Sequence, residues 1–375
     1  MKKEFFSRFF RDRHGFLEDY AKSILPRFHY KISIKRRIRR TKNIREFDLA
    51  LDFQREAKDF WLENSGRKIS LDWHRAYIAT NGIVDVRYVP EDLFYGVVEQ
   101  KLNRFELAKA YQDKNNYDLL FSGFSMPRTV LRNINGRFFD GQYRHLQMDE
   151  AEELILENLT NQKLVVKPSI DSGGGRKVII LHPKDAEQGI HDALRSIFAS
   201  LDGDFIVQDY VEQCTLLHQL HESSLNTLRI MTLRLDGEIH FLSGIVRMGN
   251  LGSEVDNATV GGLTCGFNKE GLLNSFATEH YAYRKHRFHP YSGFVFEGSR
   301  IPHIDKVIDF VRNLHQRLTY FDLVSWDVAI NKFGNPVLIE ANLKMQDINF
   351  HQRNNGPLFG PFTEEVLCRV FEDHF

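Results

Sequence analysis

The stretch SWDVAINKFGNPVLIEAN, residues 325–342, carries the most specific pattern in the sequence. Two β-rich runs flank residues 332–334, which predicts a hairpin. Asp327 lies on one strand, and Glu340 and Asn342 lie on the other. Residues two apart on a strand share a face, so these three oxygen-bearing side chains should converge. Mg²⁺ prefers oxygen ligands and keeps some coordination for nucleotide phosphates, so the stretch predicts a magnesium site.

A hairpin with solvated acids at a sheet edge is the alternative interpretation of this stretch. It accounts for an isolated Asp–Glu pair, but not for the apolar residues that flank the polar ones. These flanking residues are of the apolar types found in protein cores: Val328, Ile330, Val337 and Ile339. The metal site is therefore favoured.

A second pattern, LVVKPSIDSGGGRKVIIL at residues 164–181, reads as a strand, a glycine-rich loop and another strand. Three consecutive glycines, Gly173, Gly174 and Gly175, let backbone amides approach a phosphate closely. Lys167 ends the first strand, where its charge could neutralise that phosphate. The spacing matches neither GxxxxGK[ST] nor GxGxxG. A plain glycine-rich hairpin turn is the alternative.

Two further strands carry polar residues. In FIVQDYVEQ, residues 205–213, backbone groups of residues 209–211 could pair with an adenine edge, although the run by itself is only a strand. In SSLNTLRIMTL, residues 223–233, Arg229 follows Asn226 on a strand, and arginine suits bidentate contacts to phosphate or carboxylate. An unpaired arginine on an interior strand would be costly, so it should point into a polar cleft; a surface arginine is the alternative.

The composition is that of a folded globular protein. The chain has 375 residues, 42% of them hydrophobic, and a formal net charge of zero. This length predicts two or three domains. The three cysteines, Cys214, Cys265 and Cys368, form no CxxC pair and are too sparse for a disulfide framework. A reducing cytoplasm is the expected compartment.

The charge is unevenly distributed along the chain. Residues 1–45 hold fifteen lysines and arginines but only four acidic residues. A basic, phenylalanine-rich helix could lie on the anionic inner face of the cytoplasmic membrane. The alternative is a helical cap whose phenylalanines pack on the core. Nothing else supports nucleic-acid binding. The sequence shows neither a run of about 18–20 apolar residues for a membrane-spanning helix nor a secretory signal.

The arrangement of helices and strands predicts an α+β architecture with antiparallel sheets and packed helices. Residues 1–75 read as helical, with a phenylalanine-rich helix first and a second helix over residues 44–62. The basic segment 31–42 should lie between them. Beyond residue 163 short strands alternate with helices, and the turn at Asp236-Gly237 predicts a hairpin between two long strands.

Taken in order, these pieces resemble the ATP-grasp superfamily. The matching elements are Asp113-Lys114, residues 123–127, Lys167-Pro168, residues 172–175, residues 208–211, and Asp327 with Glu340 and Asn342. Within it, the chain is similar to the sugar-transfer-associated group of polysaccharide and capsule biosynthesis. The stretches that carry this likeness are DKNNYDLLF, SSLNTLRI, VRMGNLGSEVDNATVGGL, FHPYSGFVFEG and SWDVAI.

The resemblance implies an ATP-grasp fold over residues 91–375, with two α+β subdomains that grip ATP between antiparallel sheets and a hinge near residues 208–212. A helical basic region would cover residues 1–90. ATP and Mg²⁺, with Mn²⁺ as a substitute, would be the cofactors. The residues that would hold the nucleotide are Lys114, Lys167, Ser172, Gly173, Gly174, Gly175, Gln208, Asp209, Tyr210, Val211 and Glu212.

The same resemblance assigns the rest of the site. Arg229 would lie near the transferred phosphoryl group, with Lys167 and Asn226 as further catalytic residues. Asp327, Glu340 and Asn342 would bind Mg²⁺. Candidate substrate residues are Arg247, Asp256, Asn257, Gly261, Gly262, His289 and Lys344. The chain departs from many relatives at Gln208, where they carry glutamate, and at residues 343–346, where they place a proline-glycine turn.

The implied reaction is ATP-dependent ligation, in which a carboxylate attacks the γ-phosphate and an amine or other nucleophile then displaces phosphate from the acylphosphate. A sugar or polysaccharide precursor is the expected substrate. A kinase on the same fold and a non-enzymatic scaffold that binds anionic surfaces are the alternatives. His280, His286 and His289 lie in a segment too basic for a zinc site and are interpreted as loop or substrate-contact residues.

Overall fold

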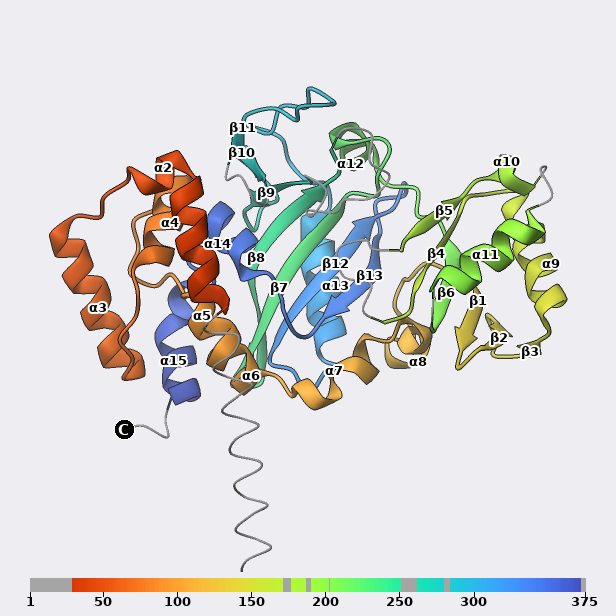
Figure 1. Ribbon diagram of the computed structural model, residues 1–375, viewed down its shortest axis with the longest axis horizontal. Coiled ribbons are helices and arrows are strands. Elements are labelled where there is room, and N and C mark those ends of the chain that lie inside the picture. Colours follow the sequence, from red (N-terminus) through yellow and green to blue (C-terminus); the bar gives the residue numbers. More distant parts are fainter. Residues whose placement is uncertain are drawn as a thin grey trace, which may run out of the picture. The chain divides into compact units, whose positions relative to one another are not determined.

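The computed structural model describes residues 29–170, 177–186, 190–201, 203–250, 262–279 and 284–371 (Figure 1). The chain forms two compact units, Met1–Arg104 with Asp347–Phe375, and Phe105–Gln346. The first unit thus combines the two ends of the chain, which differs from the predicted division at residue 90. In the described part no helix is both long and apolar enough to span a bilayer.

The first unit contains only helices and loops among its described residues. Its helices are residues 29–40, α2 (Lys42–Arg45), α3 (Leu51–Ser65), α4 (Asp72–Asn81), α5 (Glu91–Leu93), the π-helix η1 (Phe94–Val98), α6 (Glu99–Leu102), α14 (Ile348–Asn355), η5 (Gly360–Phe362) and α15 (Thr363–Phe371). Gly82 ends α4 with a left-handed φ of 80°, a conformation that glycine adopts readily at the end of a helix.

Buried polar contacts hold this helical unit together. The Glu91 carboxylate accepts a hydrogen bond from Tyr77 at 2.8 Å and forms an ion pair with Arg37 at 3.5 Å. Burial raises the pKa of Glu91, and Arg37 opposes that shift. The Gln352 side chain bonds both the N–H and the C=O of Val89, which ties the C-terminal segment to the N-terminal helices.

The basic segment 31–42 was predicted to lie between two helices of a helical region, and most of it forms a helix of its own. Residues 29–40 form a helix, because Ile34 is buried against the unit and Arg37 reaches Glu91. The predicted helix over residues 44–62 is divided into α2 and α3. The phenylalanine-rich helix predicted at the start of the chain lies outside the described residues.

The second unit contains two antiparallel sheets. The six-stranded sheet has the order β3-β2-β1-β6-β4-β5 and the seven-stranded sheet has the order β11-β10-β9-β8-β7-β12-β13. The strands are β1 (Thr129–Ile134), β2 (Arg137–Asp140), β3 (His145–Leu146), β4 (Leu164–Pro168), β5 (Ile179–Leu181), β6 (Phe205–Asp209), β7 (Thr227–Leu235), β8 (Glu238–Met248), β9 (Leu263–Phe267), β10 (Leu273–Glu279), β11 (Lys285–His286), β12 (Leu323–Ile330) and β13 (Pro336–Asn342). The predicted α+β class is confirmed.

Helices cover one face of each sheet (Figure 1). The helices of this unit are α7 (Phe105–Gln112), η2 (Lys114–Asn116), α8 (Tyr117–Leu120), α9 (Met148–Leu159), α10 (Pro183–Ala186), α11 (His191–Leu201), α12 (Thr215–Leu220) and α13 (Ile304–His315). Apolar residues at helical spacing, such as Val307, Val311 and Leu314 of α13, are fully buried against the seven-stranded sheet. In the same way α9 and α11 bury Ile155 and Leu194 against the six-stranded sheet.

The tight turns follow their predicted chemistry. Asp236 and Gly237 join β7 to β8 with φ values of 47° and 84°, the left-handed conformation that a two-residue hairpin turn requires. Between β12 and β13 the Asn331 side chain accepts hydrogen bonds from the N–H groups of Phe333 and Asn335. Both predicted hairpins are therefore confirmed.

Candidate active site

The predicted metal-binding residues meet across the β12–β13 hairpin, and a β-bulge makes this possible. Near the turn Ile330 pairs with Pro336 and Val328 with Leu338, a register that would place Asp327 opposite Ile339. The register instead shifts by one residue, so that Asp327 pairs with Glu340. Without this bulge, the Glu340 side chain would point to the face of the sheet opposite the Asp327 side chain.

A second bulge brings two arginines to the same carboxylate. From the Asp236-Gly237 turn, regular pairing would put Arg229 opposite Gly244, with Arg247 on the other face. A shift between Met231 and Thr232 pairs Arg229 with Ile245, two residues from Arg247. Arg247 therefore shares a face with Arg229.

Asp327 is the centre of a buried charge network. Its carboxylate accepts hydrogen bonds from Nε and Nη2 of Arg229, both at 2.8 Å, and from Nη1 of Arg247 at 3.0 Å. Asp327 and Arg229 are only 3% and 6% exposed. Burial by itself raises the pKa of Asp327, but the two arginines outweigh it and lower the pKa to about 2. Asp327 is thus a carboxylate at every physiological pH.

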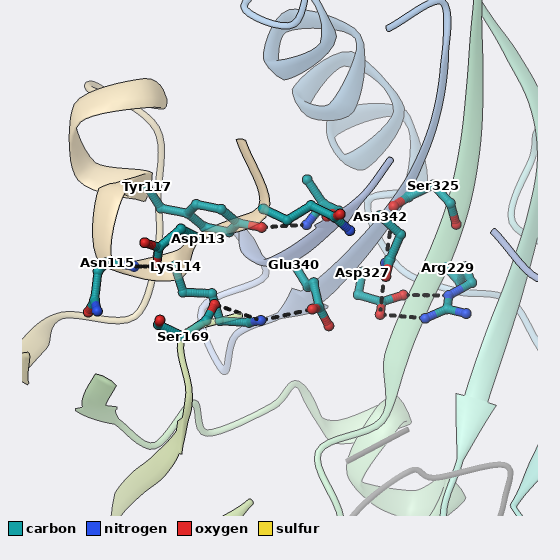
Figure 2. Close-up of polar contacts among 12 residues, drawn as sticks. Asp113, Lys114, Asn115, Tyr117, Ser169, Arg229, Ser325, Asp327, Glu340 and Asn342 are labelled. Carbon is teal, nitrogen blue, oxygen red and sulfur yellow. Dashed lines mark hydrogen bonds and ion pairs between the residues drawn. The ribbon is translucent and has the colours of Figure 1, made fainter. Parts of the chain in front are cut away.

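Lys114 forms the second cation–carboxylate contact of the site. Its ammonium lies 2.8 Å from Oε1 of Glu340, and its backbone N–H donates to Ser169 C=O, just beyond β4. The Asp113 side chain accepts the Asn115 N–H and begins the short helix η2 that carries the lysine. Lys114 thus connects the end of β4 to the hairpin of the other sheet. Figure 2 shows Lys114, Glu340, Asp327 and Arg229 in a row.

Lys167 lies near this row on β4. Its side chain is almost fully buried, and no described residue forms an ion pair or hydrogen bond with its ammonium. Burial and then the positive charge of Lys114 lower the pKa of Lys167 to about 7, while Glu340 opposes the shift. Around neutral pH this lysine is therefore poised to take up a proton when an anion arrives.

The oxygen atoms at this site fit a hard divalent cation. Asn342 donates from Nδ2 to Ser325 C=O at 3.2 Å and to Asp327 at 3.5 Å, which leaves its Oδ1 as an available acceptor. The bond from Lys114 uses Oε1 of Glu340 and leaves Oε2 available among the described residues. Two carboxylates and one amide oxygen are suitable Mg²⁺ ligands. The described residues contain no cluster of three His, Cys, Asp or Glu side chains that could hold a metal ion, so a cation here would need the Asn342 amide oxygen beside the two carboxylates.

The predicted adenine hinge lies where the chain passes from one sheet to the other. β6 of the six-stranded sheet ends at Asp209, and the Cys214 N–H donates to Ile330 C=O of β12. The Asp209 carboxylate is held by Arg128, with both bonds at 2.9 Å. Gln208 is buried and donates to Pro127 C=O. These side chains have protein partners, so adenine contacts would come from backbone groups.

Two further hinge residues, Tyr210 and Glu212, have surface contacts. Tyr210 lies under the Lys163 ammonium, with 5.3 Å from Nζ to the ring centre. Glu212 is exposed and forms an ion pair with Lys332 at 2.6 Å. Their side chains support the hinge from the solvent side.

Asn226 does not reach this charge network. Its amide donates to Leu217 C=O and His221 C=O, both at 2.7 Å, and its backbone N–H donates to Gln213. It is fully buried and fixes the loop before β7. The catalytic role of Asn226 stays a prediction, and its contacts in the structure hold this loop in place.

The candidate substrate residues fall into two groups. Among the described ones, His289 is buried and bonds to Gly249 C=O at 3.0 Å, Gly262 is buried just before β9, and Lys344 is half-buried beyond β13. Those outside the described residues are Asp256, Asn257 and Gly261, together with the predicted phosphate loop of Ser172, Gly173, Gly174 and Gly175, and His280.

The sequence analysis missed several contacts of this site. It assigned Arg247 to a substrate wall, whereas Arg247 binds Asp327. It did not foresee that Lys114 would contact Glu340, which lies 226 residues further along the chain. It also missed Tyr117, whose hydroxyl accepts the Ala341 N–H at 3.0 Å and steadies β13 between Glu340 and Asn342. No signal in the sequence pointed to Arg247, because counting from the hairpin turn places it on the face opposite Arg229.

The chain matches a known family and is similar to several solved structures. The model of the sugar-transfer-associated ATP-grasp family matches residues 97–366, well over half of the chain. The chain belongs to this family. The predicted resemblance and ATP-grasp fold are thereby confirmed. No curated protein sequence matches the chain.

Solved structures similar to the chain are distant. The ATP-grasp ligase PsnB complexed with minimal precursor is 14% identical, with a TM-score of 0.40, over 72% of this chain and 64% of that one. The L-amino acid ligase from Bacillus licheniformis is 12% identical, with a TM-score of 0.39, over 72% and 50%. The VanG D-Ala:D-Ser ligase from Enterococcus faecalis is 12% identical, with a TM-score of 0.42, over 75% and 63%. The matched region thus spans less than two thirds of each of these proteins.

Proposed function

We propose that this ATP-grasp enzyme is a ligase that activates a carboxylate as its acylphosphate and transfers the acyl group to an amine or another nucleophile. The observation that carries the proposal is the row of alternating charges in the second unit. Two carboxylates, on Asp327 and Glu340, face each other across one hairpin and lie among the cations Lys114, Arg229 and Arg247. Such a site positions polyphosphate and offsets the charge that moves during phosphoryl transfer.

Each side chain has a role that its contacts suggest. Asp327, Glu340 and Asn342 would hold Mg²⁺, which supplies charge neutralisation at the phosphate oxygens. Lys114 and Lys167, at the end of the six-stranded sheet, would bind the phosphates. Arg229 and Arg247 hold Asp327 ionised and add positive charge beside the transferred group.

The chemistry needs no protein nucleophile. The substrate carboxylate itself attacks the γ-phosphorus, and ADP leaves. The acceptor nucleophile then attacks the acyl carbon, and inorganic phosphate leaves. The protein contributes orientation and electrostatic stabilisation, which account for most of the acceleration in such reactions. The family description motivates a sugar or polysaccharide precursor as one substrate.

The decisive experiment measures ADP and phosphate release from ATP and Mg²⁺ with pooled amino acids and uronic acids. Release that requires both a carboxylate and an amine supports the ligase. ADP without free phosphate, together with a phosphorylated acceptor, would instead identify a kinase.

A pair of variants ties the activity to the site. Glu340→Gln should abolish phosphate release, because the change removes one charge from the metal site. Glu279→Gln is the matched control, since Glu279 lies on β10 of the same sheet, where it pairs with His286 at 2.8 Å. If Glu340→Gln turned over normally, the metal assignment would be lost.

We further propose that the basic N-terminal region contacts an anionic membrane surface. In the described part of this region, Lys35, Arg36, Arg39 and Arg40 are exposed on the helix over residues 29–40, while Ile34 anchors the helix inward. Each cation near such a surface contributes about 1 kcal/mol. Replacing all four by glutamine should reduce co-sedimentation with phosphatidylserine vesicles; sedimentation equal to that of the unchanged protein would refute the contact.

A further inference from the structure

A second cluster of polar side chains lies beside the start of β7 and the end of β8. It consists of His221, Ser224, Asn226, Gly249 and His289, all joined by hydrogen bonds. Thr227, which begins β7, pairs with Arg247 on β8. Gly249 follows Arg247 by two residues, so the cluster lies roughly 7 Å along the strand from a residue that binds Asp327.

The hydrogen bonds of this cluster determine which nitrogen of His221 carries its proton. The Asn226 Nδ2 faces two carbonyl groups, so Oδ1 is the atom that meets Ser224 Oγ at 3.0 Å. An amide oxygen only accepts, so the single hydroxyl proton of Ser224 is used there. Gly249 N–H donates to the same Oγ.

The contact of 3.0 Å between His221 Nδ1 and Ser224 Oγ therefore requires a proton on Nδ1. The opposite assignment would let Nδ1 accept the Ser224 N–H at 3.3 Å, a longer contact. It would also leave the buried Asn226 Oδ1 without a donor, which costs about 1–3 kcal/mol. The neutral tautomer with the lone pair on Nε2 keeps both 3.0 Å contacts of Ser224 Oγ, and only the longer contact from the Ser224 N–H is given up.

His221 differs in this respect from other buried histidines. His74, His289 and His315 each place Nε2 about 2.9–3.0 Å from a backbone C=O, which requires a proton on Nε2. Nε2 of His221 instead is buried and forms no hydrogen bond with any described residue. Burial and the neighbouring His289 lower the pKa of His221, whereas Glu222 opposes the shift, so the ring is neutral at pH 7.

The surroundings of His221 are rigid on one side and close to solvent on the other. The turn after His289 is pinned by Ser292 Oγ, which donates to Leu220 C=O at 2.7 Å. The Tyr291 ring packs 5.4 Å from the His221 ring and is half exposed.

We propose that Nε2 of His221 accepts the proton of the acceptor nucleophile in the second step of the reaction, an inference that rests on the ligase function proposed above. As an amine N–H or hydroxyl O–H loses its proton to Nε2, the nucleophile forms a bond to the acyl carbon. The bond from that carbon to the phosphate oxygen breaks, and phosphate leaves with the electron pair. The imidazolium then returns its proton to water. Ser224 and Asn226 are positioning residues that keep the lone pair on Nε2.

The test separates the two steps with hydroxylamine, a nucleophile reactive enough to trap an acylphosphate without a base. Full-length wild-type protein and His221→Asn are assayed with ATP, Mg²⁺ and the pooled uronic and amino acids. Asparagine keeps a donor near the Nδ1 position and removes Nε2. Hydroxamate formation should stay unchanged in the variant, while ligation should fall about 10²–10⁴-fold, the usual contribution of a general base.

Two further variants guard against a purely structural effect. Ser224→Ala should lower ligation but not hydroxamate formation, because it frees Nδ1 from its partner. His315→Gln replaces a buried histidine whose two nitrogens both have protein partners, so it should lower stability and leave the ratio of ligation to hydroxamate unchanged.

Direct observation of the ring completes the test. Long-range ¹H–¹⁵N spectra of histidine-labelled protein should show the Nδ1–H tautomer for His221 and the Nε2–H tautomer for His315. An Nε2–H tautomer for His221, or equal loss of both activities in His221→Asn, would overturn the inference. If even the wild-type protein forms no hydroxamate, the ligase function itself is refuted; hydroxamate and ligation that both persist in His221→Asn refute only the role of His221.

Discussion

Asp327 on the seven-stranded sheet and Lys167 on the six-stranded sheet are both buried charged residues, but their surroundings differ. The seven-stranded sheet surrounds Asp327 with Arg229 and Arg247, so each buried charge has a partner. The six-stranded sheet buries Lys167 without an ion pair among the described residues, and its pKa falls to about 7. Paired charges stay fixed, whereas an isolated one responds to a ligand. Asp327 thus belongs to a fixed charge framework, whereas Lys167 is the residue that we propose responds to a phosphate.

The largest effect should come from breaking the paired side. Asp327→Asn leaves two guanidinium groups buried without their counter-charge, which should lower the free energy of unfolding by about 3–5 kcal/mol. ATP turnover should fall at least about 10³-fold, since charge stabilisation at the transferred phosphate is lost. Chemical denaturation and steady-state turnover measure the two effects. A variant as stable as the unchanged protein would contradict the framework.

The same comparison predicts a milder effect on the unpaired side. Lys167→Met should weaken ATP binding roughly 10–100-fold, because one charge-assisted hydrogen bond contributes about 1.5–3 kcal/mol. Stability should be unchanged or slightly higher, since a buried ammonium without a partner is removed. Calorimetric titration and thermal melting test both statements. Lys167→Arg is the control that keeps the charge. A marked loss of stability in Lys167→Met would mean that the Lys167 ammonium has an ion-pair or hydrogen-bond partner in the folded protein.

The lowered pKa of Lys167 also predicts that the protein takes up a proton when ATP binds. Between pH 7 and 10.5 the unfolded chain holds a proton on Lys167 that the folded chain lacks, so this group makes stability rise with pH over that window. ATP phosphates favour the charged form and raise the pKa again. Binding near pH 8 should therefore take up close to one proton. Calorimetry in buffers of different ionisation enthalpy measures it, and no uptake is expected for Lys167→Arg.

The smallest effect is expected at the hinge. The Asp209 carboxylate is already held by Arg128 and by Gln162, so it has little left for the nucleotide. Asp209→Asn should change ATP affinity by no more than the 0–1 kcal/mol of a surface ion pair, at most about fivefold. A loss as large as that of Lys167→Met would mean that the side chain itself binds adenine.

Much of the fold followed from local signals. β7 and β8 form the hairpin predicted at Asp236-Gly237, because β-branched runs and the two-residue turn are local and strong signals. The helical unit was harder to predict. The helix over residues 29–40 depends on Arg37 meeting Glu91, and the C-terminal segment depends on Gln352 meeting Val89. Contacts between residues far apart in the sequence produce no periodic pattern in it, so they could not be predicted from the sequence.

The sequence by itself determined the chemistry of the site: which residues are carboxylates, amides and cations, and that hairpins would carry them. It did not determine which faces they would share. Counting from either turn puts Glu340 and Arg247 on the wrong side of their strands. One extra residue in each strand, near Ile339 and Leu242, reverses that. A bulge is stabilised by packing of the whole sheet, so only the tertiary structure decided that these side chains would meet at Asp327.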